Sequence, residues 1–286
     1  MRPILSIVIA NYNYGRFLED AICSILAQGM GDKVEIIICD AASTDNSVDI
    51  IKKYADKIAW WCSEKDGGQS AAFNKGLSHA SGDWYTWLNA DDLYFPGALR
   101  ALFEFIERNP SAEWITGNKM HFDSGTKKII SVNWGPHRMP PFLSKNHASS
   151  GSFGPTAFWR REVYMRVGPI DEEMHYAMDT EYWARLTMAG IKQTRLKHFC
   201  WAFREHEDSK TEGVQSASIL EKRAAETKYW REKTGYTYKH DFSNPWYWLL
   251  MVWRFFDGSM LKRFCLKRCY EGKLLEFAIQ NCKECQ

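Results

Sequence analysis

Two acidic residues end a segment whose composition suits a cation site. Residues 89–92 read Asn-Ala-Asp-Asp and follow the apolar run Trp84–Leu88. Adjacent carboxylates at the end of a buried strand repel each other unless a cation or a hydrogen-bond donor lies between them. Oxygen ligands suit a hard divalent cation, which usually keeps water and phosphate oxygens as further ligands. The alternative interpretation is an ordinary loop or helix start ahead of Pro96.

Two earlier segments could contact a nucleotide. Asp40 could offer a carboxylate to a ribose or a base edge, while Ser43 or Asp45 can cap the helix that follows. Residues 67–70 (Gly-Gly-Gln-Ser) form a turn into a helix, which is either an anion site or a plain turn. The first strand is followed neither by G-x-G-x-x-G nor by a P-loop, so side chains must provide any nucleotide recognition.

A later segment carries two acidic residues at the start of an expected helix. Residues 178–186 read Met-Asp-Thr-Glu-Tyr-Trp-Ala-Arg-Leu. Asp179 precedes the expected helix and can point into a cleft, whereas Glu181 faces elsewhere. Taken alone, Asp179 could simply cap the helix.

The apolar pattern predicts the scaffold that brings these segments together. Strand and helix patterns alternate four times in about 110 residues, which predicts right-handed βαβ units on a mostly parallel sheet. Ligands of such sheets bind beyond the carboxyl ends of the strands. The polar residues that follow the four expected strands are residues 11–13, Asp40, residues 64–66 and residues 89–92.

The pattern becomes mixed after about residue 112. The expected strands are 114–117, 119–122, 129–133, 153–159 and 194–203, and a helix is expected over 180–189. Residues 215–234 have a charged, helical composition, and residues 244–277 are aromatic and basic.

Composition excludes several classes of protein. The chain has 286 residues, of which 45% are hydrophobic and 25% charged, and this excludes disorder, collagen and coiled coil. Lys and Arg total 37 against 35 Asp and Glu, so there is no global basic field of the kind that binds nucleic acid. Because no apolar run reaches the length of a spanning helix, we expect a cytoplasmic protein.

Together, the motifs resemble those of family 2 glycosyltransferases of GT-A fold. The matching segments are 6–13, 40–45, 68–76, 87–92, 154–159, 178–186 and 204–210. The resemblance implies an α/β fold with a Rossmann-like, mostly parallel central sheet flanked by helices and a C-terminal helical extension. It implies three parts: a nucleotide-sugar half (1–110), an acceptor half (111–214) and the aromatic and basic extension (215–286).

The implied activity is an inverting, metal-dependent sugar transfer in polysaccharide biosynthesis. The donor would be a nucleoside diphosphate sugar, with UDP the commonest nucleotide of the family, and the acceptor a hydroxyl of a glycan or of a polyprenyl-linked saccharide. Asp179 would be the catalytic base, because the attacking hydroxyl needs a carboxylate within hydrogen-bond reach to accept its proton. Asp91 would bind Mn²⁺ or Mg²⁺, with His206 as a second metal or phosphate contact. Asn89 stands where the family's D-x-D motif usually has its first aspartate.

The resemblance assigns further residues to the two substrates. The donor-binding residues would be Ala10, Asn11, Asn13, Asp40, Ser43, Asp66, Gln69, Asn74, Asn89 and Ala90. The residues on the acceptor side would be Thr156, Trp159 and Glu181. Two other functions stay open: a catalytically inactive relative that binds a nucleotide sugar or a glycan, and a nucleotidyltransferase. The second lacks the phosphate loop rich in Gly, Arg and Lys that we would expect near residues 11–20.

The C-terminal part allows two interpretations at each of two features. Residues 245–256 are rich in Trp and Phe and precede Lys262, Arg263, Lys267 and Arg268. Such a helix could dock on an anionic membrane, here the inner face of the plasma membrane, or pack on the catalytic domain or in an oligomer. The cysteines have roughly the spacing of a zinc site, although free thiols on a terminal helix are the simpler interpretation. They are Cys265, Cys269, Cys282 and Cys285.

Overall fold

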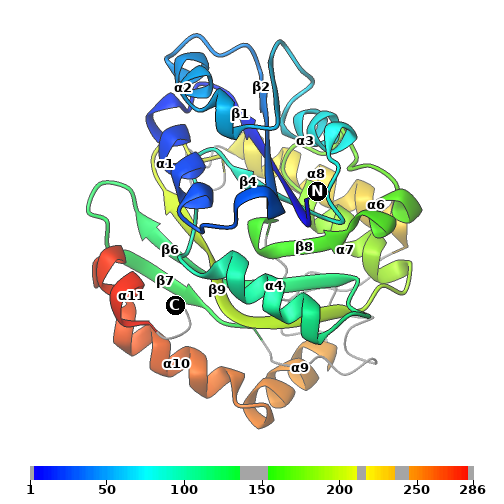
Figure 1. Cartoon of the computed structure of the whole chain (residues 1–286). Helices are drawn as coiled ribbons and strands as arrows, with labels where there is room; N and C mark the ends of the chain where they lie inside the picture. Colours follow the sequence, from blue (N-terminus) through cyan, green and yellow to red (C-terminus); the bar gives the residue numbers. More distant parts are fainter. Residues whose placement is uncertain (1–2, 136–153, 211–216, 236–244, 283–286) are drawn as a thin grey trace.

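The core of the computed structural model is a nine-stranded sheet flanked by helices (Figure 1). The structure describes residues 3–135, 154–210, 217–235 and 245–282. The strand order is β3-β2-β1-β4-β8-β6-β9-β5, and β7 pairs with β6 outside this path. The sheet therefore joins the first half of the chain to the second through the β4–β8 pair.

The first half has the predicted alternation of strands and helices. The four strands are β1 (Leu5–Asn11), β2 (Val34–Asp40), β3 (Trp60–Ser63) and β4 (Trp84–Asn89), and they pair in parallel. The helices between them are α1 (Gly15–Leu26), α2 (Ser47–Lys53) and α3 (Gln69–His79). The prediction from apolar periodicity is confirmed for this half.

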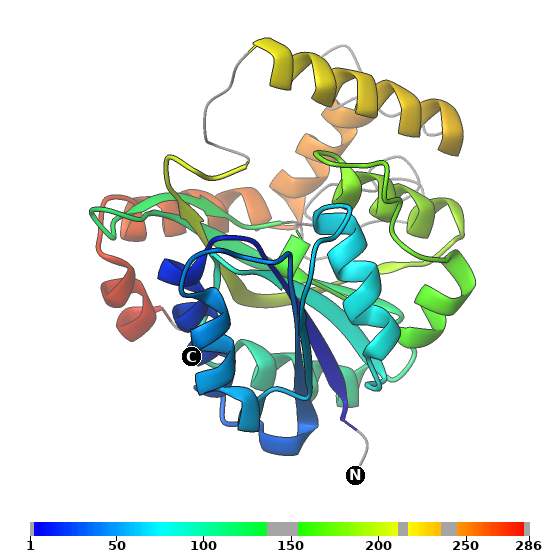
Figure 2. The same cartoon turned by 90° about the horizontal axis from the view of Figure 1, so that it is seen from above.

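Alternate residues of β1 contact opposite layers of helices, as side chains of a strand must. Ile7 packs with Leu18 of α1 and Ile51 of α2, whereas Val8 packs with Phe73 of α3. Figure 2 shows α3 on the other side of the sheet from α1 and α2. Gly76 lets α3 approach the sheet closely, because a Cβ there would lie 2.3 Å from a methyl group of Val8.

Beyond β4 the sheet is mixed rather than parallel. The strands are β5 (Leu93–Tyr94), β6 (Trp114–Asp123), β7 (Ile129–Asn133), β8 (Ala157–Arg160) and β9 (Gln193–Glu205). β8 pairs antiparallel with both β4 and β6, while β9 runs parallel to β6. The two expected strands 114–117 and 119–122 form the single strand β6. Its register shifts near Gly117, where a Cβ would lie 2.4 Å from the Sγ of Cys200.

Buried tryptophans fix the helix that carries the candidate base. The helices of this half are α4 (Ala98–Arg108), α6 (Arg161–Val167), α7 (Met178–Met188) and α8 (Ala217–Thr234). The ring of Trp183 on α7 stacks on Trp87 of β4 and Trp114 of β6, with centroids 5.3 and 5.5 Å apart. Much of the high aromatic content is therefore core.

Three helices follow at the C-terminal end: α9 (Pro245–Phe256), α10 (Ser259–Tyr270) and α11 (Leu275–Asn281). α10 and α11 bury Leu266, Tyr270 and Leu275 in a cluster that includes Val132 of β7. None of the helices that the structure describes has the length and apolarity needed to cross a bilayer.

The cysteines of this part do not show a zinc site in the described residues. Cys282 is buried, whereas Cys265 and Cys269 are exposed, and Cys285 lies outside the described residues. Among the described side chains there is no group of three His, Cys, Asp or Glu that could hold a metal ion.

Candidate active site

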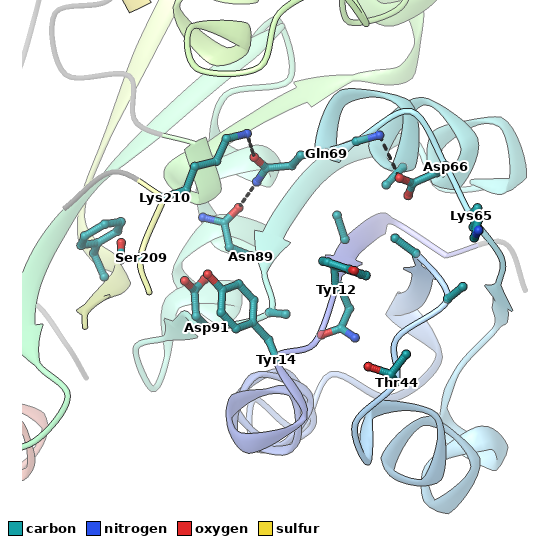
Figure 3. Close-up of a pocket in the computed structure, with 18 residues that line it drawn as sticks. Tyr12, Tyr14, Thr44, Lys65, Asp66, Gln69, Asn89, Asp91, Ser209 and Lys210 are labelled. Atoms are coloured by element: carbon teal, nitrogen blue, oxygen red, sulfur yellow. Dashed lines mark hydrogen bonds between the residues drawn. The ribbon is translucent and has the colours of Figure 1, made fainter. Parts of the chain in front are cut away.

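A pocket of about 720 Å³ lies at the carboxyl ends of the parallel strands (Figure 3). Asn11 ends β1, Asp66 follows β3, and Asn89 and Asp91 lie at the end of β4, and all four side chains line this pocket. Ala10, Gln69 and Ala90 line it as well. The expectation that the polar residues after separate strands meet at one edge of the sheet is confirmed.

Asp40 lies beneath the pocket and does not line it. The residue is 1% exposed, and its carboxylate accepts hydrogen bonds from Asn11 Nδ2 at 2.7 Å, from Ser63 Oγ at 2.6 Å and from the backbone N–H of Ser43 at 3.0 Å. A carboxylate with these three donors has its charge satisfied within the protein. The sequence-based role of Asp40 as a direct nucleotide contact is thus not supported, and Asp40 positions Asn11 instead.

Asn13 and Ser43 also act behind the pocket wall. Ser43 Oγ accepts from the Asn13 backbone N–H at 2.8 Å, and Asn13 Oδ1 accepts from the Thr44 N–H at 2.8 Å. Asn13 has a positive φ of 54°, which asparagine tolerates better than most residues. These bonds join the loops after β1 and β2, and so place Tyr12 and Thr44 at the pocket.

Asp45 is the one of the two expected capping residues that contacts the start of α2. Its carboxylate accepts a bond from the Ser47 N–H at 3.0 Å, and its other oxygen accepts from the Gly15 N–H at 2.8 Å. Asp45 thereby links the starts of α1 and α2.

Asn89 is the centre of a hydrogen-bonded chain at the pocket wall. Lys210 Nζ donates to Gln69 Oε1 at 3.1 Å, and Gln69 Nε2 donates to Asn89 Oδ1 at 3.0 Å (Figure 3). Asn89 Nδ2 then donates to Asp92 Oδ2 at 2.7 Å. This position needs one acceptor and one donor, which an amide provides. An aspartate here would instead set two carboxylates against each other.

Asp92 is a structural residue rather than a cation ligand. It is fully buried, and its second oxygen accepts from the Arg204 backbone N–H at 2.9 Å. Burial, with a contribution from the charge of Asp91, raises the pKa of Asp92 well above its ordinary value. The two adjacent carboxylates therefore have different roles, because only Asp91 lines the pocket.

Asp91 and His206 form the part of the site best suited to a cation. Asp91 Oδ2 lies 3.1 Å from His206 Nε2, and the His206 ring packs against the rings of Tyr14 and Phe17. In this structure the two groups are hydrogen-bonded to each other, and a carboxylate and an imidazole are both ligands that can bind a divalent ion. Substrate oxygens or water would have to complete the coordination shell.

Asp179 lies in the first turn of α7, outside the lining of this pocket. Its Oδ1 accepts from the Thr180 N–H at 2.6 Å and from Thr180 Oγ1 at 3.2 Å. Burial raises the pKa of Asp179. Burial lowers the pKa of Lys210, and the charges of Glu226 and Asp179 oppose this shift. Asp179 thus acts on the charge of a residue that lines the pocket.

Four sequence-predicted residues have structural roles away from the pocket. Glu181 is fully buried and pairs with Arg185 at 2.6 Å, so the expected acceptor contact is contradicted. Asn74 donates to the Ile170 carbonyl at 2.8 Å and ties α3 to the loop before α7, instead of meeting the donor. Trp159 and Thr156 are both fully buried, Trp159 within the tryptophan core.

Several lining residues were not assigned from the sequence. Tyr12 is 60% exposed at the pocket, and Tyr14, Thr44, Lys65 and Lys210 also line it. Tyr12 and Lys65 stand inside polar segments that the sequence does indicate. Lys210 belongs to the late segment 204–210 and could have been found there as a cation in the same segment as the expected phosphate contact, His206.

Comparison with known proteins agrees with this geometry. Residues 6–168 match the model of glycosyl transferase family 2. The chain is 36% identical over 182 residues to the uncharacterized glycosyltransferase alr2836 of Nostoc sp., and this alignment covers 58% of this chain and 54% of the relative. It is 28% identical to the putative glycosyltransferase EpsE of Bacillus subtilis, in an alignment that covers 72% of this chain and 75% of the relative. The chain thus spans about half the length of the first of these curated relatives.

Two solved structures share the fold. S. aureus TarS 1–349 in complex with UDP-GlcNAc aligns with a TM-score of 0.63 and 16% identity, covering 78% of this chain and 66% of that one. The mannosyltransferase PcManGT of Pyrobaculum calidifontis, in complex with GDP-Man and Mn²⁺, aligns with a TM-score of 0.55 and 15% identity, covering 94% and 81%. The family model covers more than half of the residues, and the architecture is that of GT-A glycosyltransferases. The chain therefore belongs to glycosyl transferase family 2.

Proposed function

We propose that this chain is an inverting glycosyltransferase that moves a sugar from a nucleoside diphosphate sugar, a UDP-sugar, to an acceptor hydroxyl. The observation that carries the proposal is the pocket at the ends of β1, β3 and β4, with Asp91 in its wall, His206 hydrogen-bonded to Asp91, and Asp179 in the first turn of α7. The acceptor would be a glycan or a polyprenyl-linked saccharide in polysaccharide biosynthesis. The complexes of TarS with UDP-GlcNAc and of PcManGT with GDP-Man support the donor class.

The donor would bind with its nucleoside over the loops after β1 to β3 and its diphosphate toward Asp91. Tyr12, Thr44 and Asp66 line the first region, and Asp91 and Lys210 line the second (Figure 3). Asp91 and His206 would hold a Mn²⁺ or Mg²⁺ ion, in keeping with the Mn²⁺ of the PcManGT complex. When bound, the ion would neutralise the charge that develops on the leaving diphosphate.

The acceptor hydroxyl would attack the anomeric carbon from the face opposite the diphosphate. Its proton passes to the carboxylate of Asp179 as the new glycosidic bond forms and the bond to the diphosphate breaks. The raised pKa of Asp179 makes this carboxylate a stronger base than an exposed aspartate. The configuration inverts, and no covalent bond to the enzyme is needed.

Each of the three parts of the chain would have a different function. Residues 1–110 would bind the donor, residues 111–214 the acceptor, and residues 215–286 would form the extension. The exposed aromatic and basic face of α9 and α10 would attach the protein peripherally to the inner face of the plasma membrane, where a polyprenyl-linked acceptor resides.

Hydrolysis of nucleotide sugars in the absence of acceptor tests this function. The full chain is incubated with UDP-, GDP- and dTDP-sugars, with and without Mn²⁺, and release of the nucleoside diphosphate is measured. We expect slow, Mn²⁺-stimulated release from one UDP-sugar. Binding of a nucleotide sugar without release from any member of the panel, even when mixed glycan and polyprenyl-linked acceptors are added, would identify an inactive binding relative instead.

A further inference from the structure

A second cavity of about 490 Å³ adjoins the nucleotide pocket. The two cavities share Gly68, Gln69 and Lys210 as lining residues. On its other sides the second cavity is lined by His175 and Tyr176, just before α7, and by α8 residues that include Lys222 and Glu226. It therefore lies between the pocket and α8, beside the helix whose first turn carries Asp179.

Two cations lie against the ring of Tyr176, which lines this second cavity. Lys210 Nζ lies 5.5 Å and the Arg223 guanidinium carbon 5.4 Å from the centre of the ring, which are distances of cation–π contacts. Arg223 is not itself a lining residue, but its Nη2 donates to the Lys210 carbonyl at 2.8 Å. Lys222, an exposed residue of the lining, adds a third positive charge.

The acidic residue of the cavity is held by backbone groups. Glu226 accepts from the N–H groups of His175 at 3.0 Å, Tyr176 at 2.7 Å and Ala177 at 3.0 Å. These bonds orient the carboxylate, but its negative charge remains and acts on Lys210. Lys210 and Lys222, with Arg223 bound to the Lys210 carbonyl, still outnumber this one carboxylate, so the second cavity is an electropositive groove beside α7.

We propose that this groove binds the acceptor and that the acceptor carries an anionic group, a phosphate or a carboxylate, close to the sugar that receives the transfer. The proposal rests on the proposed function and adds the chemical class of the acceptor. A ligand in the groove approaches from the side of α7, while the nucleotide occupies the neighbouring pocket. An inverting transfer needs an acceptor hydroxyl that approaches from a side other than the leaving diphosphate, and the groove offers a separate entrance beside α7.

Three small probes separate charge from sugar recognition: glucose 1-phosphate, glucuronate and methyl glucoside. Their dissociation constants are measured by NMR titration with the full chain saturated with UDP and Mn²⁺, so that the nucleotide pocket is filled. At low salt we expect at least one anionic probe to bind about fivefold or more tightly than the neutral glycoside. The preference should diminish at high salt. Tighter binding of glucose 1-phosphate would indicate that the acceptor carries a phosphate, and tighter binding of glucuronate that it carries a carboxylate.

Variants of α8 place the effect in the groove. Lys222→Gln should reduce the preference for the anion about threefold and leave the affinity for UDP and for methyl glucoside unchanged. Lys228→Gln, which removes an exposed lysine of the same helix outside this cavity, is the matched control and should change nothing.

Equal binding of all three probes would overturn the proposal, as would an anion preference that survives in both Lys222→Gln and Arg223→Gln. Failure of the proposed function has a different signature, since no nucleoside diphosphate would then be released from any nucleotide sugar in the hydrolysis assay. UDP binding without a charge preference would reject the anionic acceptor alone.

Discussion

The parallel half of the sheet and the C-terminal helices use the same residue types in opposite ways. In the first region, large apolar side chains such as Trp84 and Trp87 are almost fully buried, and the polar residues are collected at one edge. In the second, Trp248 is 53% exposed, Phe255 69% and Phe256 77%. Exposed apolar surface of this extent usually marks an interaction site. The first region thus buries its large apolar side chains within the protein, while the second leaves them exposed to solvent.

The charges of the two regions point to different partners. At the pocket, Asp91 faces His206, and Asn89 is enclosed between Gln69 and Asp92. Residues 245–270 contain five Lys or Arg residues and one acidic residue, Asp257. Positive charge beside exposed Trp and Phe suits the headgroup region of an anionic membrane. Figure 1 shows α9 and α10 at the opposite end of the molecule from α2.

The largest effect is expected for the base. Asp179→Asn should reduce turnover about 10²- to 10⁴-fold, because the hydroxyl loses its proton acceptor, and leave donor affinity within a few-fold. Steady-state kinetics and UDP calorimetry measure the two quantities. Glu173→Gln, at an exposed residue in the loop before α7, serves as the control. Turnover near the wild-type rate in Asp179→Asn would remove Asp179 from the mechanism.

The pH dependence follows from the same residue. Asp179 must be deprotonated to act as a base, and burial raises its pKa. The activity should therefore fall as the pH drops through a value above the ordinary aspartate pKa of about 3.9. A profile of kcat/KM against pH gives this value, and an acid limb at or below the ordinary value would contradict the assignment.

The two regions should also differ in how much a substitution lowers the free energy of unfolding. Asp92→Ala removes the acceptor of both the Arg204 N–H and the Asn89 amide, so we expect the free energy of unfolding to fall by about 2–4 kcal/mol. Phe256→Ser, in the exposed region, should change it by less than about 0.5 kcal/mol. Urea unfolding monitored by circular dichroism compares both. A similar loss in the two variants would show that α9 is as tightly integrated as the pocket.

Removal of the candidate metal ligand should have a moderate effect. Asp91→Ala should weaken UDP binding in the presence of Mn²⁺ by about 10- to 100-fold and have less effect without the ion. Calorimetry with and without chelator measures the difference. Unchanged, Mn²⁺-dependent UDP affinity in this variant would locate the cation elsewhere.

The smallest effect tests the exposed region. Lys267→Gln/Arg268→Gln should reduce sedimentation with anionic liposomes several-fold at low salt, since basic residues near such a surface attract its anionic lipids. Lys33→Gln/Lys52→Gln removes the same charge from the other region and should have no effect. Equal, negligible sedimentation of wild type and of the chain truncated at residue 243 would leave the aromatics as an oligomer contact.

The local pattern of the chain predicts the scaffold and much of the pocket. The apolar periodicity of residues 4–108 determines which segments are strands and which are helices, because burial on one or both faces is a local property of spacing. The parallel pairing then brings the residues after each strand to one edge. The assignment of Asn11, Asp66, Asn89 and Asp91 to one site therefore follows from their positions along the chain.

Contacts between distant parts of the chain decided the rest. Asp40 and Glu181 carry charges that suggest a binding role, yet Asp40 is enclosed by Asn11, Ser43 and Ser63, and Glu181 by Arg185. Burial of a charged group depends on which partners the fold brings to it, and no local pattern encodes that.

The second cavity is the clearest example of a feature that depends on contacts between distant parts of the chain. It combines Gln69 of α3, Tyr176 before α7, Lys210 after β9 and Lys222 of α8, four segments that the sequence keeps far apart. The sequence by itself determined which polar residues lie at the carboxyl edge of the sheet, because the parallel topology brings the ends of these strands together. The tertiary structure decided which carboxylates stay free to act and where the electropositive groove forms, because both depend on how α7 and α8 pack beside that edge.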